Sequence, residues 1–296
     1  MVRQFAFAAV LVAFSCSANS AADPNAAKYV IRGDASGEES DNLDKAIREY
    51  TEAIRRDPKD AKAYLMRGSL WNVKNELDNA IKDCSEAIRL DPKFASAYSN
   101  RANAWSQKGE LDNAIKDFTE AIRFDPKDAN AYNRRGETWS LKGDLDNAIK
   151  DHTEAIRLAP KDASACERRG EAWQIKGKLG HAIEDYAEAI RVDPTHAFAA
   201  YNNLAWLQTT CPDEHFRDGK KAVANATKAC ELSAWKSPQC LDTLAAACAE
   251  AGDFSNAITW QQKAIEMVPK ESDKQVMETH LKLYKAGKPY RDVPKK

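Results

Sequence analysis

The cysteines are the residues of this sequence best suited to chemistry. A thiolate can act as a nucleophile or bind a metal ion, and two thiols can form a disulfide bond in an oxidising compartment. Apart from Cys16, the cysteines are Cys84, Cys166, Cys211, Cys230, Cys240 and Cys248. The last four lie close together along the chain. Their clustering keeps open one hypothesis, a thiol- or metal-dependent activity in the C-terminal part.

Cys211 and Cys230 are our candidate disulfide pair. Cys211 follows one predicted helix and Cys230 lies near the end of the next, with a loop between them. Cys230 and Cys240 form the competing pair, because sequence alone does not fix disulfide connectivity. Cys211 and His215 carry atoms that could bind a metal ion, but no second ligand pair follows at a known spacing. We therefore expect no metal site.

The rest of the sequence offers no catalytic constellation. It contains no HExxH zinc motif, no glycine-rich phosphate loop after a strand, and no strand pattern. The five histidines have no recurrent partner. We predict a protein that is not an enzyme and that needs no cofactor.

Arginine and aspartate recur in step through the middle of the chain. The two series are Arg67, Arg101, Arg135 and Arg169, and Asp83, Asp117, Asp151 and Asp185. They could be read as a row of charged sites. Because both series keep the spacing of the apolar residues around them, we predict ion pairs within or between structural units instead. Such pairs contribute little to stability where they are exposed.

The stretch that positions these residues is 95–126, which recurs almost unchanged along the chain. Its apolar residues fall at helical spacing in two series: Tyr98, Ala102 and Trp105, then Leu111, Ala114, Ile115, Phe118, Ala121 and Ile122. The first series predicts a helix, called helix A, that ends at Gly109. The second predicts helix B, which stops before Pro126. The short link makes the two helices an antiparallel hairpin, which needs neighbouring hairpins to bury its apolar faces.

A fixed period of 34 residues connects these hairpins. It is marked by Pro58, Pro92, Pro126, Pro160 and Pro194. Together with the aromatic and small residues of each unit, such as Tyr98, Ala102, Trp105, Gly109, Ala114, Phe118 and Ala121, this pattern resembles the tetratricopeptide repeat (TPR) family. The resemblance implies an all-α fold, a right-handed α-solenoid of antiparallel helix hairpins (a TPR superhelix) with a C-terminal capping helix.

The period predicts how the chain is divided. Residues 1–22 are a signal peptide, 23–58 a degenerate first repeat, and 59–194 four regular TPR repeats. Residues 195–269 are two degenerate repeats with an inserted loop near 209–219, and 270–296 are the capping helix and tail. In the first repeat, the polar segment from Asp34 to Ser40, which contains Gly37, predicts a frayed helix A.

The first 22 residues predict export. Arg3 precedes an apolar run from Phe5 to Phe14 and then small residues, which is the pattern of a secretory signal peptide cut after Ser20 or Ala22. Lipidation of Cys16 is the alternative. No other stretch is long and apolar enough to span a membrane. The C-terminal TCPD and LDTLAAA stretches resemble degenerate TPR ends of bacterial proteins, so we expect a bacterial protein that is periplasmic or secreted.

The overall charge argues against nucleic acid as a partner. Lysine and arginine number 44, aspartate and glutamate number 45, and the net charge is −1. A nearly neutral chain does not attract nucleic acid or anionic lipid at long range. The partner we expect is therefore a protein or a peptide.

The predicted binding groove lies on helix A, on the side opposite the Tyr98, Ala102 and Trp105 stripe. In TPR proteins this side lines a concave surface that binds partner segments. The residues of this sequence that match it are Lys62, Met66, Ser99, Asn100, Asn103, Asn130, Asn133, Arg134, Glu137, Glu167, Arg168 and Glu171. Asparagine and arginine can bond the backbone and carboxylates of an extended peptide. The resemblance thus implies a non-catalytic scaffold for protein–protein interaction; a solvated face and a self-associating structural protein are the alternatives.

Overall fold

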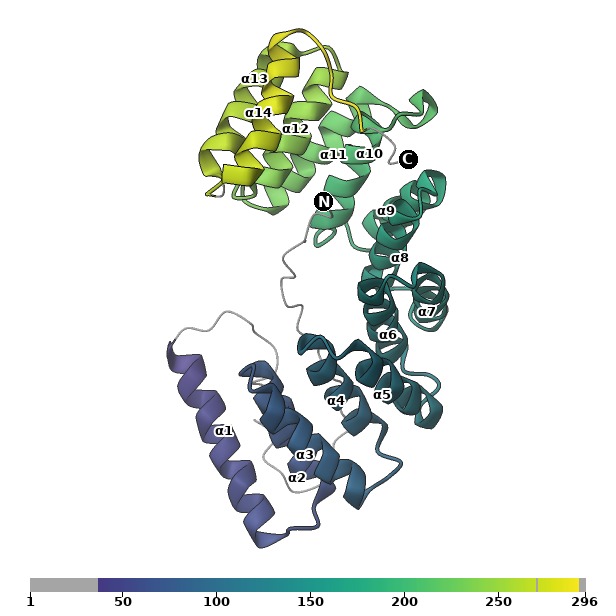
Figure 1. Cartoon of the computed structure of the whole chain (residues 1–296), viewed down its shortest axis with the longest axis vertical. Helices are drawn as coiled ribbons and strands as arrows, with labels where there is room; N and C mark the ends of the chain where they lie inside the picture. The colour runs from purple at the N-terminus through teal and green to yellow at the C-terminus, as the bar shows by residue number, and fades with distance from the viewer. Residues whose placement is uncertain (1–36, 270, 293–296) are drawn as a thin grey trace. The chain divides into compact units, whose positions relative to one another are not determined.

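The computed structural model describes residues 37–269 and 271–292 of the chain. These residues form fourteen α-helices and a short 3-10 helix, and none of the described residues is in a strand. The chain divides after Lys142 into two compact units (Figure 1). The predicted all-α fold of helix hairpins is confirmed. The predicted signal peptide, 1–22, lies outside the described residues.

The first unit contains six helices. They are α1 (Gly37–Arg56), α2 (Ala61–Val73), α3 (Leu77–Leu90), α4 (Ala95–Gln107), α5 (Leu111–Phe124) and α6 (Ala129–Lys142). Helices α2, α4 and α6 are A helices, and α3 and α5 are B helices. Helix α2 packs against α1 and α3, helix α4 packs against α3 and α5, and helix α6 packs against α5. Residues 37–40 of the polar segment belong to the start of the long helix α1, and the rest of the predicted frayed helix A lies outside the described residues.

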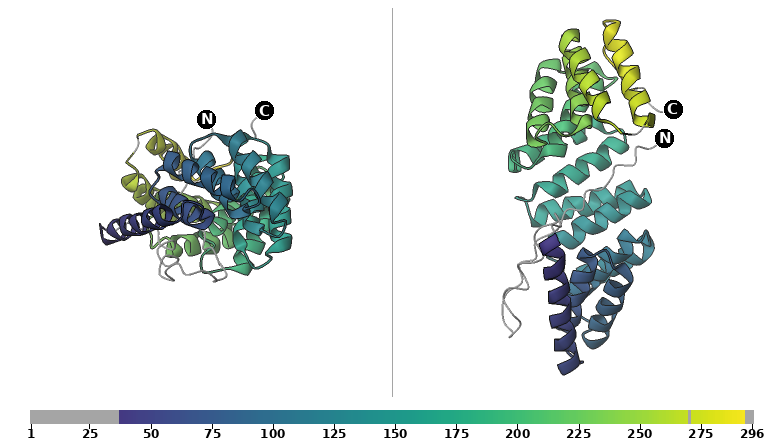
Figure 2. Two further views of the ribbon diagram at one scale, coloured as in Figure 1. Left: turned by 90° about the horizontal axis from the view of Figure 1, so that it is seen from below. Right: turned by 90° about the vertical axis from the view of Figure 1, so that its left-hand side faces the viewer.

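The second unit contains eight helices and the 3-10 helix. They are α7 (Leu145–Leu158), α8 (Ala163–Ile175), α9 (Leu179–Val192), α10 (Phe198–Thr210), the 3-10 helix Glu214–Phe216, α11 (Gly219–Leu232), α12 (Pro238–Glu250), α13 (Phe254–Met267) and α14 (Glu271–Lys285). Neighbouring helices lie side by side with alternating directions (Figure 2). Helix α14 packs on α13 and buries Met277 and Tyr284 in the same core as Leu241 and Ala257. It caps the last hairpin, as predicted.

A left-handed residue ends most of the A helices. Gly109, Gly143 and Gly177 have φ angles of 80°, 86° and 71°, and Asn75 takes φ 60° at the corresponding place in the hairpin of α2 and α3. Glycine adopts this conformation without steric cost and asparagine adopts it more easily than other residues. In these hairpins one backbone position therefore fixes the turn between the helices.

Substitutions at Gly109 should separate this backbone effect from packing. A Cβ atom at Gly109 would meet nothing within 4 Å, so strain at positive φ is the only expected cost. We expect Gly109→Ala to lower the free energy of unfolding by about 1 kcal/mol and Gly109→Asn to lower it less. Urea unfolding followed by circular dichroism measures both. Equal losses for alanine and asparagine would contradict the assignment.

The arginine and aspartate series form the predicted ion pairs. Arg101 Nε and a terminal nitrogen lie 2.7 and 2.9 Å from the two carboxylate oxygens of Asp117, and its other terminal nitrogen donates to Ser85 Oγ at 3.0 Å. Arg67 with Asp83 and Arg169 with Asp185 repeat this arrangement. Each of these arginines thus connects its own A helix to the B helices on both sides.

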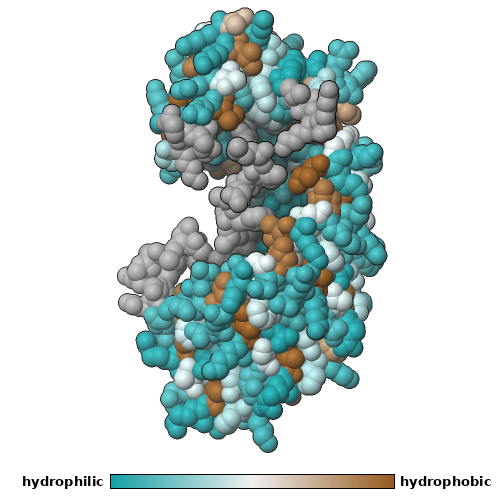
Figure 3. All heavy atoms as spheres, in the orientation of Figure 1, coloured by the Kyte–Doolittle hydropathy of each residue, from teal (hydrophilic) through white to brown (hydrophobic). Residues whose placement is uncertain are grey.

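The outer surface of both units is mostly hydrophilic on the face shown in Figure 3. Leu141, Ile175, Met267 and Val276 are the large hydrophobic residues that are exposed among those described. No described helix has the length and apolar character needed to cross a bilayer.

Candidate functional site

The A helices of the first unit form the main part of the candidate surface. Helix α4 contacts both α2 and α6, so the sides of these helices that face away from the B helices adjoin. Lys62 is exposed on α2, and Asn103 on α4 and Asn130 and Arg134 on α6 are partly exposed. Met66 is also partly exposed, although it packs against the core below it. Their exposure leaves them accessible to a partner, and the groove along them stays a prediction.

Three of the predicted groove residues are buried instead. Ser99, Asn100 and Asn133 are only 3%, 8% and 7% exposed. Asn100 shows the reason, because it joins α2 to α4: its Oδ1 accepts from Ser69 Oγ and its backbone oxygen accepts from Asn72 Nδ2, both at 3.0 Å. The prediction that these three residues are available to a partner is wrong because they are buried, and for Asn100 the contacts are with the adjacent A helix.

Arginine and glutamate form ion pairs on an A helix of each unit. Arg134 lies 3.0 Å from Glu137 on α6. In the second unit, Arg168 lies 3.0 Å from Glu171 on α8. Each pair spans one turn of its helix, so the two charges compensate one another locally. A partner carboxylate that binds either arginine must compete with this glutamate.

Glu167 is more buried than the sequence predicted. Burial raises its pKa to about 7; the Glu171 carboxylate adds to this shift, and Arg168 and the backbone of Ala200 oppose it. Part of the Glu167 population is therefore neutral near neutral pH. Ala200 lies on α10, so the Glu167 side chain reaches from α8 toward the next A helix.

Glu167→Gln should reveal this raised pKa as a change in pH dependence. The folded-state pKa of about 7 lies above the ordinary value of 4.5, so between these pH values the folded state binds more protons than the unfolded state. Stability from this group is complete below about pH 4.5 and is lost as the pH rises to about 7. We expect the variant to match the wild-type Tm at pH 4.5 and to exceed it at pH 8. A difference in Tm that is the same at both pH values would contradict the assignment.

Models of the tetratricopeptide repeat match residues 38–95, 95–128 and 129–162. This part of the chain belongs to the TPR family. Among solved structures, the crystal structure of MamA matches with a TM-score of 0.50 and 25% identity, over 54% of this chain and 94% of that one. The APC/C hetero-tetramer Cut9–Hcn1 matches with a TM-score of 0.64 and 19% identity, over 83% of this chain and 46% of that one. A search of curated proteins found no match.

The cysteines in the described part of this TPR protein are all buried. Cys211 and Cys230 are free thiols, so the predicted disulfide is wrong. Their surroundings explain why: Cys211 lies near Arg217 and Asp292, whereas Cys230 lies near Cys240 and Lys263. Among the described residues no group of three or more His, Cys, Asp or Glu side chains could hold a metal ion.

Burial also lowers the reactivity of the thiols. It raises the pKa of Cys230 and Cys84 to about 12, and that of Cys166, Cys240 and Cys248 to about 11. A thiol with such a pKa is almost fully protonated at neutral pH, and the thiolate is the reactive form. These five thiols are therefore suited to packing rather than to nucleophilic chemistry.

Three residues of the second unit occupy groove positions that were not predicted from the sequence. Gln107 lies one turn after Asn103 on the same side of α4 and therefore marks a further groove position. Tyr201 and Ala205 on α10 correspond to Tyr98 and Ala102 on α4, which places Trp206 and Thr210 where α4 has Asn103 and Gln107. By the same correspondence, Leu241 and Ala245 on α12 place Glu250 at the position of Gln107. Counting from these stripe residues would have identified all three. The repeat period does not predict which residues these three side chains contact.

Proposed function

We propose that this TPR protein is a non-catalytic scaffold that binds a protein or peptide segment on the A-helix surface of its first unit. The observation that carries the proposal is the set of partly exposed polar and apolar side chains on three adjoining A helices. They are Lys62, Met66, Asn103, Asn130, Arg134 and Glu137. The buried residues between them hold the helices together, which keeps the surface in a fixed shape before a partner arrives.

The chemistry of these side chains fits an extended segment with acidic groups. The amides of Asn103 and Asn130 can both donate and accept, as the peptide backbone requires. Lys62 and Arg134 can pair with carboxylates, and Arg134 can do so with two hydrogen bonds. Met66 offers a flexible apolar contact. A preformed surface of this kind reduces the entropy cost of binding.

The alternative, a thiol- or metal-dependent activity in the C-terminal part, gains no support from the cysteines. The buried thiols with raised pKa values weigh against a nucleophile. The scaffold is the function that the arranged side chains favour.

A charge reversal tests the scaffold proposal. Peptides that bind the full-length chain would first be selected from a displayed random library. Lys62→Glu combined with Arg134→Glu should weaken their binding at least about tenfold, because one hydrogen-bonded charge contributes roughly 1.5–3 kcal/mol. The matched control is Lys82→Glu with Lys116→Glu, which reverses two exposed charges on B helices of the same unit. Equal losses in the two double variants would contradict the proposed surface.

We also propose that the protein is exported to the periplasm or secreted. The support is the charge and hydropathy pattern of residues 1–22. Mass spectrometry of the protein from its native cells should show a mature chain that begins at Ala21 or Asp23. A chain that retains the apolar run, or one that carries a lipid on Cys16, would contradict this proposal.

A further inference from the structure

The C-terminal segment of the chain returns to the A-helix surface of the second unit. After α14, Gly287 adopts φ 67° and the chain reverses, and the backbone N–H of Lys288 donates to Leu283. The segment Pro289–Asp292, which is not helical, then runs back to α10 (Figure 1). The backbone N–H of Asp292 donates to the carbonyl of Thr210 at 2.9 Å.

Asp292 makes the densest set of contacts. Its Oδ2 accepts from Trp206 Nε1 at 2.8 Å and from Thr210 Oγ1 at 2.7 Å. Its Oδ1 accepts from the hydroxyl of Tyr290 at 3.1 Å. Helix α10 thus presents the N–H of Trp206 and the O–H and backbone carbonyl of Thr210. One aspartate residue binds all three groups with its carboxylate and its backbone N–H.

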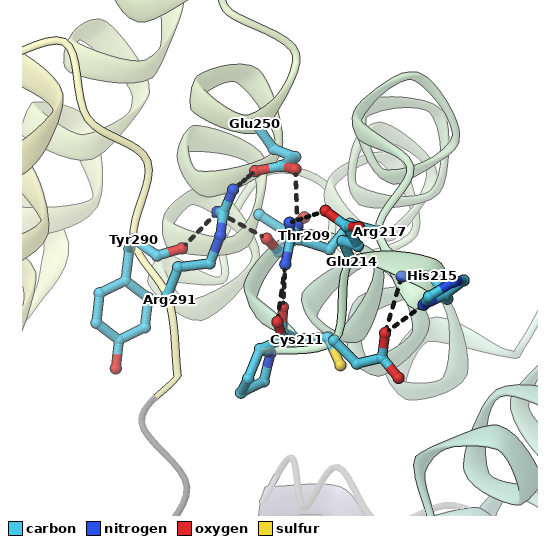
Figure 4. Close-up of polar contacts among 10 residues, drawn as sticks. Thr209, Cys211, Glu214, His215, Arg217, Glu250, Tyr290 and Arg291 are labelled. Atoms are coloured by element: carbon cyan, nitrogen blue, oxygen red, sulfur yellow. Dashed lines mark hydrogen bonds and ion pairs between the residues drawn. The ribbon is translucent and has the colours of Figure 1, made fainter.

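Arg291 binds the neighbouring helix. One of its terminal nitrogens lies 2.5 Å from Glu250 at the end of α12, and the other donates to the carbonyl of Thr209 at 3.2 Å (Figure 4). Glu250 also lies 3.2 Å from Arg217, whose guanidinium donates to the carbonyl of Cys211. Because Arg217 belongs to the loop before α11, Glu250 keeps a cation beside it even when Arg291 leaves.

Tyr290 completes the segment. Its ring centroid lies 4.2 Å from that of His280 on α14 and 5.9 Å from that of Trp206 on α10. An aromatic residue, an arginine and an aspartate therefore each contact defined groups of the surface, and Trp206 contacts both the aromatic residue and the aspartate. Trp206, Thr210 and Glu250, which provide most of these groups, are the three residues at groove positions.

We propose that this surface is a second binding site, which takes an extended partner segment with the order aromatic residue, arginine, aspartate. In the isolated chain its own Tyr290, Arg291 and Asp292 occupy the site as an intramolecular ligand. This goes beyond the proposed function, because it concerns the second unit and different residues. A short tether gives such a ligand an effective concentration on the order of millimolar, so a partner binds only when it competes with the segment.

The test uses an amidated, fluorescent peptide with the sequence of residues 286–292 and measures its binding by anisotropy. In the full-length chain, Arg291→Ala with Asp292→Ala removes the anchors of the internal segment. We expect this variant to bind the peptide at least about tenfold more tightly than the wild type. A peptide with alanine in place of the arginine and aspartate should not bind. Equal binding by variant and wild type, or equal binding of both peptides, would overturn the proposal.

Two further measurements keep the test decisive. Adding Glu250→Gln to the double variant should weaken peptide binding. Adding Lys62→Glu with Arg134→Glu instead should leave peptide binding unchanged. A loss of binding at the second-unit site can therefore be distinguished from a loss of binding at the A-helix surface of the first unit. Chymotrypsin provides a readout on the wild type itself. Cleavage between Tyr290 and Arg291 should be slower in the wild type than in the Asp292→Ala single variant, which leaves this bond unchanged but removes the contacts of Asp292 with Trp206 and Thr210. Equal cleavage rates after Tyr290 would show that the segment is not held.

Discussion

Replacing Phe118 with alanine is expected to lower the free energy of unfolding by about 3–5 kcal/mol. Phe118 on α5 is only 1% exposed and packs against Ala102 and Ala114, which are fully buried, and against Trp105. The two alanines are too small to fill the space that the ring would leave, so a cavity would remain. Urea unfolding followed by circular dichroism measures the loss.

Phe124 provides the matched control on the same helix. It is partly exposed, and its ring lies beside Tyr98 with a centroid distance of 5.7 Å. Phe124→Ala should therefore cost much less than Phe118→Ala. Similar losses at the two positions would contradict the packing described for α4 and α5.

Replacing Asp117 with alanine is the second large expected effect, also about 3–5 kcal/mol. The Asp117 side chain is 6% exposed and that of Arg101 is 21% exposed, so the substitution leaves a largely buried guanidinium without its carboxylate. Burial of an unpaired charge costs far more than the pair itself contributes. Unfolding in urea again provides the measurement.

Two controls separate this effect from a general loss of charge. Glu120→Ala on the same helix removes an exposed ion pair with Arg123 and should change stability little. Arg101→Met combined with Asp117→Leu removes both charges and should recover a large part of the loss. If the double variant is as unstable as Asp117→Ala, the cost does not arise from the unpaired arginine.

The hairpins and their ion pairs could be predicted because they depend on local spacing. Helices A and B are set by apolar residues a few positions apart, and Arg101 meets Asp117 across a single short turn. The same geometry recurs in the repeats of Arg67 and Arg169. A wrong assignment in one repeat would therefore have disagreed with the pattern of the other repeats.

The failures arise where contacts cross from one repeat to the next. A helical projection shows that Asn100 points away from helix B, but it does not show the neighbouring A helix that buries it. For the same reason, spacing did not reveal that Cys211 and Cys230 have different neighbours. Trp206 donates a hydrogen bond to Asp292, which lies far from it in the sequence, and the repeat period does not predict this contact.

The most direct test of the scaffold proposal is site-specific photo-cross-linking. A photoreactive benzoylphenylalanine would replace Asn103 on the A-helix surface or, as control, Lys116 on the exposed side of α5. After irradiation in an extract of the native cells, we expect protein adducts from position 103 and few from position 116. Adducts from position 116 without adducts from position 103 would contradict binding on the A-helix surface.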